Sequence, residues 1–334
     1  MKRLDYTNAV ATMRVYEKRL LDSVKIDRMV DAASAEDVLK ILSETEYSKA
    51  MVGLNGPHDF EIALKNELER VYGEMYRLTV DKNLIEILAL KYDYQNIKAL
   101  LKGSASGEDA GHILQDMGTI PMSEIRSNFE SGNLNDYDPH IKGAINEAKE
   151  DFEKNKDPQR IDLIVDRYYF SHLGELAEKA QDVPIIKAYV KYTVDTFNLL
   201  SLLRAKNQNK DIRFVEGILV DGGNIPKSEL LSVFGDSYES IANKLRKYPT
   251  GPVLKKGIES FIQTGRLGEL EKLLENGQMK IIKPSKQVVF GPEPLFSYVV
   301  AKERENKLLR IILVSKLNNI SADKTRERLR DIYV

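Results

Sequence analysis

The chain has 334 residues, a formal net charge of −1 and no cysteine. This length is enough for two or three domains, and the near-neutral charge argues against a general binder of nucleic acids or membrane surfaces, which would carry a basic excess. The absence of cysteine excludes a disulfide framework, a thiolate zinc site and a cysteine nucleophile, and it fits a reducing compartment. No run of about 18 apolar residues occurs and the first residues hold no apolar signal core, so we expect no transmembrane helix and no secretion signal.

Helical periodicity runs through most of the chain, and loop signals rich in glycine, asparagine and proline divide it. In chain order, helical patterns cover residues 4–49, 60–102, 141–152, 161–179, 183–206, 226–234, 237–245 and 254–275. Residues 280–290 could hold a short strand or an extended arm. A long helix led by Pro294 follows and ends near residues 318–319, and Ser321 can cap a last short helix. No regular alternation supports a sheet, so the predicted fold class is all-α.

An acidic residue followed three positions later by asparagine recurs on three helical segments, at intervals of roughly one hundred residues. The copies are Asp93 with Asn96, Asp195 with Asn198, and Glu303 with Asn306. Leucines follow in the first two copies, whereas the third has Arg310 in the corresponding place. Either the acid and amide tie neighbouring helices or cap a loop within each repeat, or the three copies face a common space and meet a partner there. The neighbouring leucines require burial, which favours the structural role. Arg310 is then either a buried partner of Glu303 or an exposed residue that meets a partner.

A second pattern follows the first two copies. Gly118-x-Ile120-Pro121 matches Gly223-x-Ile225-Pro226, and residues 319–321 hold a shortened third copy. The shared order predicts three homologous helical domains, at residues 1–132, 133–236 and 237–334. With three repeats, a closed pseudo-threefold arrangement is as natural as an open solenoid.

Residues with recognisable chemistry are few. The histidines are His58, His112, His140 and His172, and none lies three or four positions from another, so no helical metal pair is expected. No phosphate-binding loop and no nucleophile elbow occurs. We therefore predict no catalytic, cofactor-binding or metal-binding residues. Arg167, which precedes two tyrosines and a phenylalanine, is either a solvated arginine beside core aromatics or an anchor for a protein partner.

Four segments resemble a known family. They are GPEPLFSYVVAKERENKLLRIILVSKLNNIS (291–321), YTNAVATMRVYEKRLLD (6–22), LKILSETEYSKAM (39–51) and YDYQNIKALLKG (92–103). They are similar to segments of the C subunit of archaeal and bacterial A/V-type rotary ATPases, called d in the eukaryotic vacuolar enzyme. The sequence departs from the family at Lys307, where the other two repeats have an aliphatic residue, and in its opening NAVATMR, where many members have an earlier arginine.

The resemblance implies a funnel-like, all-helical protein of three similar domains around a pseudo-threefold axis, without catalytic activity or cofactor. Its partners would be the central-shaft subunits, of D and F type, and the membrane rotor ring, between which it transmits torque. It would be cytoplasmic and peripheral to the membrane, and Arg167 and Arg310 are the predicted partner contacts. The sequence leaves open whether the coupled ion is Na⁺ or H⁺, and whether ATP is made or hydrolysed.

Two rival hypotheses come from other classes. One is a stand-alone α-helical repeat adaptor, which would bind proteins or peptides in an open groove. The other is a helical hydrolase that uses paired carboxylates, which the lack of histidine clusters disfavours.

Overall fold

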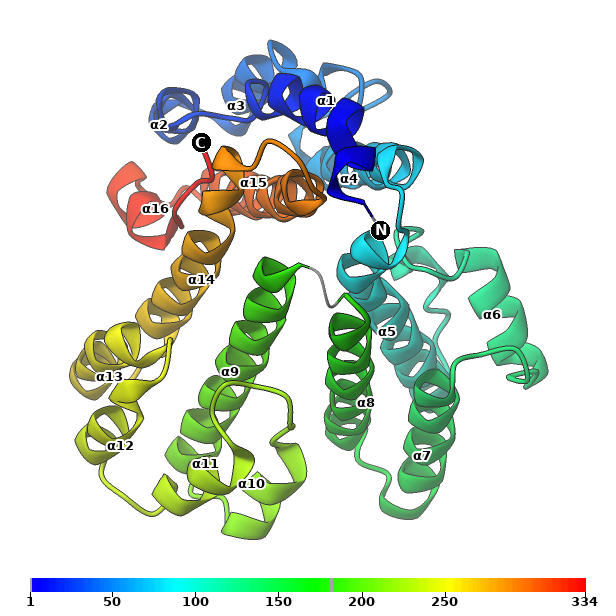
Figure 1. The fold of residues 1–334 in the computed structure, drawn as a ribbon, viewed down its shortest axis with the longest axis vertical. Helices are drawn as coiled ribbons and strands as arrows, with labels where there is room; N and C mark the ends of the chain where they lie inside the picture. The colour runs from blue at the N-terminus through cyan, green and yellow to red at the C-terminus, as the bar shows by residue number, and fades with distance from the viewer. Residues whose placement is uncertain (1, 181–182) are drawn as a thin grey trace. The chain divides into compact units, whose positions relative to one another are not determined.

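The fold is built from helices. The computed structural model describes residues 2–180 and 183–334, and Figure 1 shows their path. Within these ranges the regular structure consists of α-helices and short 3₁₀ helices, with no strand, so the predicted all-α class is confirmed. The extended arm or strand expected at residues 280–290 is wrong, because most of this segment forms the end of α14 (Gly268–Ile282) and the 3₁₀ helix Lys283–Gln287.

The chain divides into two compact units. Unit 1 comprises Met1–Ile85 together with Met279–Val334, and unit 2 comprises Glu86–Gln278. The boundaries fall inside α5 (Asn83–Ser106) and α14. Unit 2 contains the first two copies of the repeated motif, and unit 1 contains the third. The repeat boundaries at residues 132 and 236 both lie within unit 2, and the pseudo-threefold grouping of the repeats stays a prediction.

Unit 1 is organised around the long helix α15 (Glu293–Leu317), which has Pro294 in its first turn as expected. The other helices of this unit are α1 (Thr7–Glu17), α2 (Ser23–Asp31), α3 (Ala35–Ser43), α4 (Phe60–Leu78) and α16 (Ala322–Arg328), with 3₁₀ turns at Arg3–Tyr6, Glu46–Ser48 and Pro57–Asp59. α15 contacts α1, α3, α4 and α16, and nearly all of its first seventeen residues are buried. A helix packed on several sides needs apolar residues around its circumference, which explains why its sequence shows no single apolar stripe.

The apolar core of unit 1 joins the two ends of the chain. Met29, Val38 and Leu42 of the N-terminal helices pack in one cluster with Leu309 and Ile312 of α15. Burying each of these side chains contributes roughly 1.5–3 kcal/mol. The short helices begin at side-chain caps: Asp22 accepts from the backbone N–H of Lys25 at 2.8 Å.

Unit 2 consists of consecutive helices that pack mainly against their sequence neighbours. These are α5, α6 (Met122–Ser131), α7 (Pro139–Asn155), α8 (Pro158–Lys179), α9 (Pro184–Asn207), α10 (Ile212–Ile218), α11 (Lys227–Val233), α12 (Tyr238–Lys244), α13 (Gly251–Thr264) and α14, with 3₁₀ turns at Gly111–Ile113 and Leu245–Lys247. α7 and α8 lie side by side as a hairpin, because only residues 156–157 separate them (Figure 1). Lys156 adopts a left-handed conformation and ends α7, and Asp157 caps α8.

None of the helices in the described part of the chain combines the length and the apolar character that crossing a membrane requires.

Candidate functional site: the repeated motif and the exposed arginines

The aspartates of the first two motif copies each fasten a loop that follows their own helix. Asp93 on α5 accepts hydrogen bonds from the backbone N–H and the hydroxyl of Thr119, at 2.9 and 2.7 Å, and from the N–H of Ile120 at 3.1 Å. Asp195 on α9 accepts from the N–H of Ile225 at 3.0 Å and from the amide of Asn224 at 2.8 Å. The two patterns that recur separately in the sequence therefore bond to each other.

The asparagines repeat an equally regular contact. The side-chain amide of Asn96 donates to the carbonyl of Gln115 at 2.7 Å, and its oxygen accepts from the N–H of the same residue at 2.9 Å. Asn198 forms the same pair of bonds with Val220, at 2.8 and 2.9 Å. Each asparagine side chain thus satisfies the backbone N–H and the backbone carbonyl of one loop residue, as the backbone of a neighbouring strand does in a sheet.

The glycines of the second pattern allow this close approach. A Cβ atom at Gly118 would come closer than 3.0 Å to the carboxylate of Asp93, and one at Gly223 would do the same at Asp195. Burial raises the pKa of Asp93 to about 6, against the opposing hydrogen bonds from Thr119, and burial also raises the pKa of Asp195.

The third copy uses a different set of partners. The hydroxyl of Tyr47 donates to Asn306 Oδ1 at 2.7 Å, and Asn306 Nδ2 donates to the carbonyl of Leu64 at 2.7 Å. Tyr72 Oη donates to Glu303 Oε1 at 2.5 Å. These partners belong to the N-terminal part of unit 1, so the third copy ties the two ends of the chain together instead of fastening the loop that follows it.

A buried ionic cluster lies beside Asn306, and sequence reasoning missed it. Lys302 Nζ lies 2.7 Å from Glu305 Oε1 and 3.1 Å from Glu67 Oε1. Glu305 Oε2 also accepts from the backbone N–H of Leu21 at 2.6 Å, and Arg70 donates two 2.8 Å bonds to Glu67. Burial alone would lower the pKa of Lys302, but Glu305, Tyr298 and Glu67 raise it above its ordinary value. The spacing of Lys302 and Glu305 is a weak signal that many exposed pairs share, and nothing in the sequence joins Glu67 to them.

Arg310 lies at the surface, so the hypothesis that it is buried is wrong. Its side chain is 49% exposed, and it donates to both carboxylate oxygens of Glu61, at 2.6 and 2.7 Å. Arginine is accommodated at this position of α15 because its side chain is half-exposed and pairs with Glu61 in the first turn of α4, whereas its neighbour Leu309 is buried.

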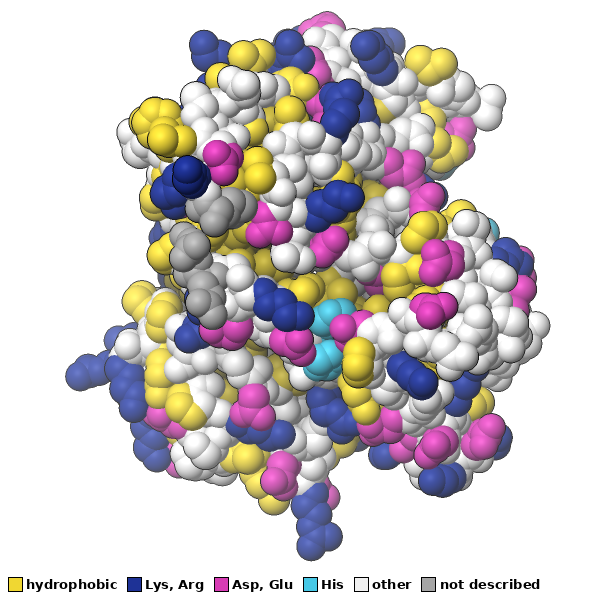
Figure 2. Space-filling model, turned by 45° about the vertical axis from the view of Figure 1, so that its right-hand side comes forward, with side chains coloured by type: hydrophobic (Ala, Val, Ile, Leu, Met, Phe, Trp, Pro, Cys, Tyr) yellow, Lys and Arg dark blue, Asp and Glu magenta, His cyan; other side chains and the backbone are white. Residues whose placement is uncertain are grey.

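Arg167 on α8 is also partly exposed. It donates to Glu147 of α7 at 2.6 Å, and its guanidinium lies over the ring of Tyr168. Phe170 in the same segment is buried and contacts the ring of Phe197. Figure 2 shows acidic and basic side chains mixed over one face of the molecule, with apolar ones between them. Whether Arg167 or Arg310 contacts a partner stays a prediction.

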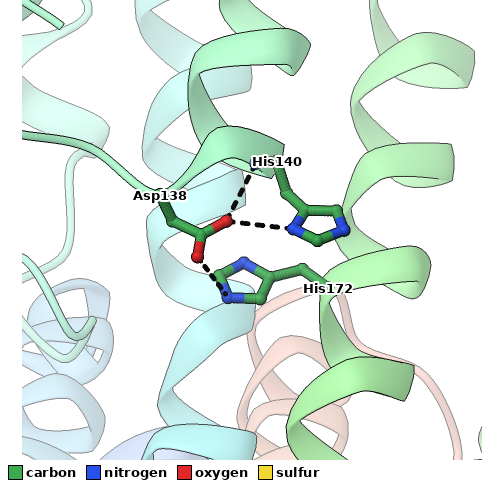
Figure 3. A group of neighbouring side chains, drawn as sticks. All are labelled: Asp138, His140 and His172. Atoms are coloured by element: carbon green, nitrogen blue, oxygen red, sulfur yellow. Dashed lines mark hydrogen bonds and ion pairs between the residues drawn. The ribbon is translucent and has the colours of Figure 1, made fainter. Parts of the chain in front are cut away.

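The structure brings together two histidines that the sequence left apart. His140 in the first turn of α7 and His172 on α8 stack with ring centroids 5.0 Å apart, and both adjoin Asp138 (Figure 3). The expectation that no histidine cluster exists is therefore wrong. Sequence spacing could not reveal the cluster, because the hairpin of α7 and α8 supplies the proximity. Burial lowers the pKa of His172. Burial alone would raise the pKa of Asp138, but hydrogen bonds from the backbone and ring of His140 lower it.

Comparison with known proteins identifies the family. The family model described as ATP synthase (C/AC39) subunit matches residues 9–328. The C subunit of the V-type sodium ATPase of Enterococcus hirae is 23% identical over 330 residues, which are 99% of each chain. The C subunit of the A-type ATP synthase of Methanocaldococcus jannaschii is 24% identical, over 97% of this chain and 86% of its own length. That of Thermoplasma volcanium is 24% identical, over 94% of each chain. Because the family model spans nearly the whole sequence, the chain belongs to the ATP synthase (C/AC39) subunit family, as a C subunit of the V-type and A-type ATPases.

Proposed function

We propose that the chain is a non-catalytic central-stalk subunit of a V/A-type ATPase, a socket that links the rotating shaft to the membrane rotor ring. In this role it transmits torque between the part of the complex that handles ATP and the part that carries ions. The observation that supports this most is the extent of the family match, which covers residues 9–328.

A subunit that transmits torque must resist deformation. Closely packed helices meet this requirement, because protein interiors have low compressibility. The motif copies add polar cross-links at three places: Asp93 and Asp195 hold loops to their helices, and Asn306 holds α15 to the segment around Tyr47 and Leu64. Hydrogen bonds shielded from water contribute more to rigidity than exposed ones.

The partners are the shaft subunits, of D and F type, and the polar loops of the ring, and the protein lies on the cytoplasmic side, peripheral to the membrane. Three domains at residues 1–132, 133–236 and 237–334, arranged around a pseudo-threefold axis, would form the funnel that receives the shaft. An interface that must also release the shaft is better built from polar residues than from a large apolar surface. Arg167 and Arg310 fit such an interface, since each is partly exposed and forms an ion pair, with Glu147 and Glu61 respectively, in which a partner's acid can replace the carboxylate.

Binding of the purified chain to each partner tests this proposal. Immobilised full-length chain is exposed separately to the shaft subunits and to the detergent-solubilised ring of its host enzyme. Both should bind, and the chain alone should not hydrolyse ATP. Arg167→Glu and Arg310→Glu should weaken one of the two interactions, because charge reversal at an interface slows association. Arg126→Glu is the matched surface control, since Arg126 is also partly exposed and paired with acids.

Failure to bind either partner, or ATP hydrolysis by the isolated chain, would overturn the proposal. If both partners bind and the arginine variants match the control, the socket role stands and the assignment of these two contacts is wrong.

A further inference from the structure

We propose that Asp138, His140 and His172 of unit 2 bind one divalent transition-metal ion, for which Zn²⁺ is the best match. This departs from the sequence-based prediction of no metal ligands, and it is independent of the proposed role in the ATPase. The ion would fasten the start of α7 to α8.

The three ligand groups already converge. His140 Nδ1 lies 3.0 Å from Asp138 Oδ1, and His172 Nε2 lies 3.6 Å from Asp138 Oδ2 (Figure 3). All three ligand atoms are within 4.8 Å of one another. Two ligands of a tetrahedral zinc ion, each about 2.0–2.1 Å from the metal, are about 3.3 Å apart. Asp138 presents a different oxygen to each histidine, so the ion takes both oxygens or the carboxylate turns to share one of them. The two rings, which stack nearly parallel, must also turn and approach each other to direct both nitrogens at one ion.

The backbone explains why these groups meet. Asp138 is the N-cap of α7 and accepts a 2.8 Å hydrogen bond from the N–H of His140, which fixes the carboxylate beside the first turn. His172 comes from α8, which returns along α7 after the turn at residues 156–157. The site thus lies at the end of the hairpin far from its covalent connection, where a cross-link restrains the two helices most.

The remaining ring nitrogens have partners of the kind that orient metal ligands. Tyr94 Oη lies 3.3 Å from His172 Nδ1, and Glu175 Oε2 lies 3.8 Å from His140 Nε2. Ligating imidazoles usually donate their second N–H to a carboxylate, a hydroxyl or a carbonyl, and this contact sets the tautomer. Here the tyrosine and the glutamate occupy those positions, so His140 Nδ1 and His172 Nε2 are the nitrogens turned toward Asp138.

The ligand types select the class of ion. Two imidazoles and one carboxylate suit Zn²⁺, Co²⁺ or Ni²⁺, whereas Mg²⁺ and Ca²⁺ prefer sets made only of oxygen atoms. A tetrahedral ion would take water as its fourth ligand. Asp138 and His140 are half-buried and His172 is buried, so the site is shielded yet reachable from the surface on one side.

The alternative is a metal-free cluster in which the ring of His140 donates to Asp138 and Tyr94 donates to His172. Both arrangements use the same contacts, so a measurement with added metal must separate them.

The full-length chain is stripped with a chelator and titrated with ZnSO₄ by calorimetry. We expect one ion per chain with micromolar or tighter affinity. Bound Co²⁺ should give the visible absorption bands of a nitrogen- and oxygen-ligated ion, and the melting temperature should rise by at least about 3 °C at a hundredfold excess of Zn²⁺ over Kd.

Variants assign the ion to this cluster. His140→Gln, His172→Gln and Asp138→Asn should each weaken Zn²⁺ binding at least tenfold and abolish the Co²⁺ bands. His112→Gln, at an exposed histidine of the same unit, should leave both unchanged. His140 is only half-buried, so His140→Gln keeps the test valid even if the His172 variant folds poorly.

Binding weaker than millimolar would overturn the proposal. Zn²⁺ affinity that is unchanged in His140→Gln, or that is lost equally in His112→Gln, would also overturn it, because the ion would then bind elsewhere. MgCl₂ should produce no comparable rise in the melting temperature, and an equal rise would contradict the assigned ligand chemistry.

Discussion

Lys302 of α15 and Glu67 of α4 form an ion pair of 3.1 Å in which each side chain is only 1% exposed. Removing charges from water is costly, and such a pair persists only when further polar contacts satisfy both groups. Glu305 supplies a second carboxylate to Lys302, and Arg70 supplies two hydrogen bonds to Glu67. The pair therefore links helices from opposite ends of the sequence within unit 1.

Replacing Lys302 by methionine should strongly destabilise the protein. The substitution leaves the buried carboxylates of Glu67 and Glu305 without their shared cation, and losing one partner of a buried pair typically costs about 3–5 kcal/mol. Urea unfolding measures this loss. Arg310→Ala is the control, because it breaks the exposed pair with Glu61, which is worth about 1 kcal/mol or less. Equal losses in the two variants would contradict the assigned importance of burial.

Alanine substitutions at two glycines should have opposite effects. Gly118→Ala forces a Cβ against the carboxylate of Asp93, and overpacking of this kind costs about 1–3 kcal/mol. Gly174 lies inside α8, and a Cβ added there would meet no atom of another element within 4 Å, so Gly174→Ala should instead stabilise by about 0.5–1 kcal/mol, because alanine favours the helix. Thermal melting of both variants checks the signs, and a neutral Gly118→Ala would show that the loop can move away freely.

Asp195→Ala and Asn198→Ala should reduce stability more than they reduce binding to the shaft. Asn198→Ala leaves the buried N–H and carbonyl of Val220 without their partners, at about 1–3 kcal/mol for each group. The melting temperature and the shaft affinity are to be measured on the same samples. An unchanged melting temperature together with lost shaft binding would assign the motif to the interface instead.

The buried Asp93 should make stability depend on pH. Its folded pKa of about 6 lies above the value of about 3.9 in an unfolded chain, so the folded state holds the proton more tightly. The contribution of this proton to the free energy of unfolding is fully present below about pH 3.9, the pKa of the unfolded chain, and is lost as the pH rises through 6. Between pH 5 and pH 7 the loss should be about 1 kcal/mol.

Asp93→Asn isolates this effect from other titrating groups. Between pH 5 and pH 7, the difference in unfolding free energy between the wild type and Asp93→Asn should change by about 1 kcal/mol. The wild type should lose stability relative to Asp93→Asn as the pH rises from 5 to 7. A pH-independent difference would show that the carboxyl group is ionised throughout this range in the folded protein.

The sequence predicted those features that depend on local patterns. Helical periodicity indicated the all-α class, and proline and asparagine marked both ends of α15, which spans Glu293–Leu317. The repeat also showed that Asp93 and Asp195 are equivalent, as their matching bonds to Ile120 and Ile225 demonstrate.

Features that depend on long-range contacts were not predictable in the same way. Asn306 has the sequence signature of the other copies, yet its partners are Tyr47 in the 3₁₀ turn Glu46–Ser48 and Leu64 in α4, which tertiary packing brings near. Likewise, burial of Lys302 depends on Glu67, and the stacking of His140 on His172 depends on the hairpin of α7 and α8. A charge or a histidine considered singly in a sequence carries no information about such partners.

Bridging is the property that most directly defines a rotor socket. The shaft subunits and the detergent-solubilised rotor ring of the host enzyme are mixed with and without the full-length chain, and the fraction of shaft that sediments with the ring is measured. If the chain is the socket, the shaft sediments with the ring only when the chain is present, at near-equal amounts of chain and shaft. Equal sedimentation of the shaft without the chain, or a chain that remains in the supernatant, would contradict this role.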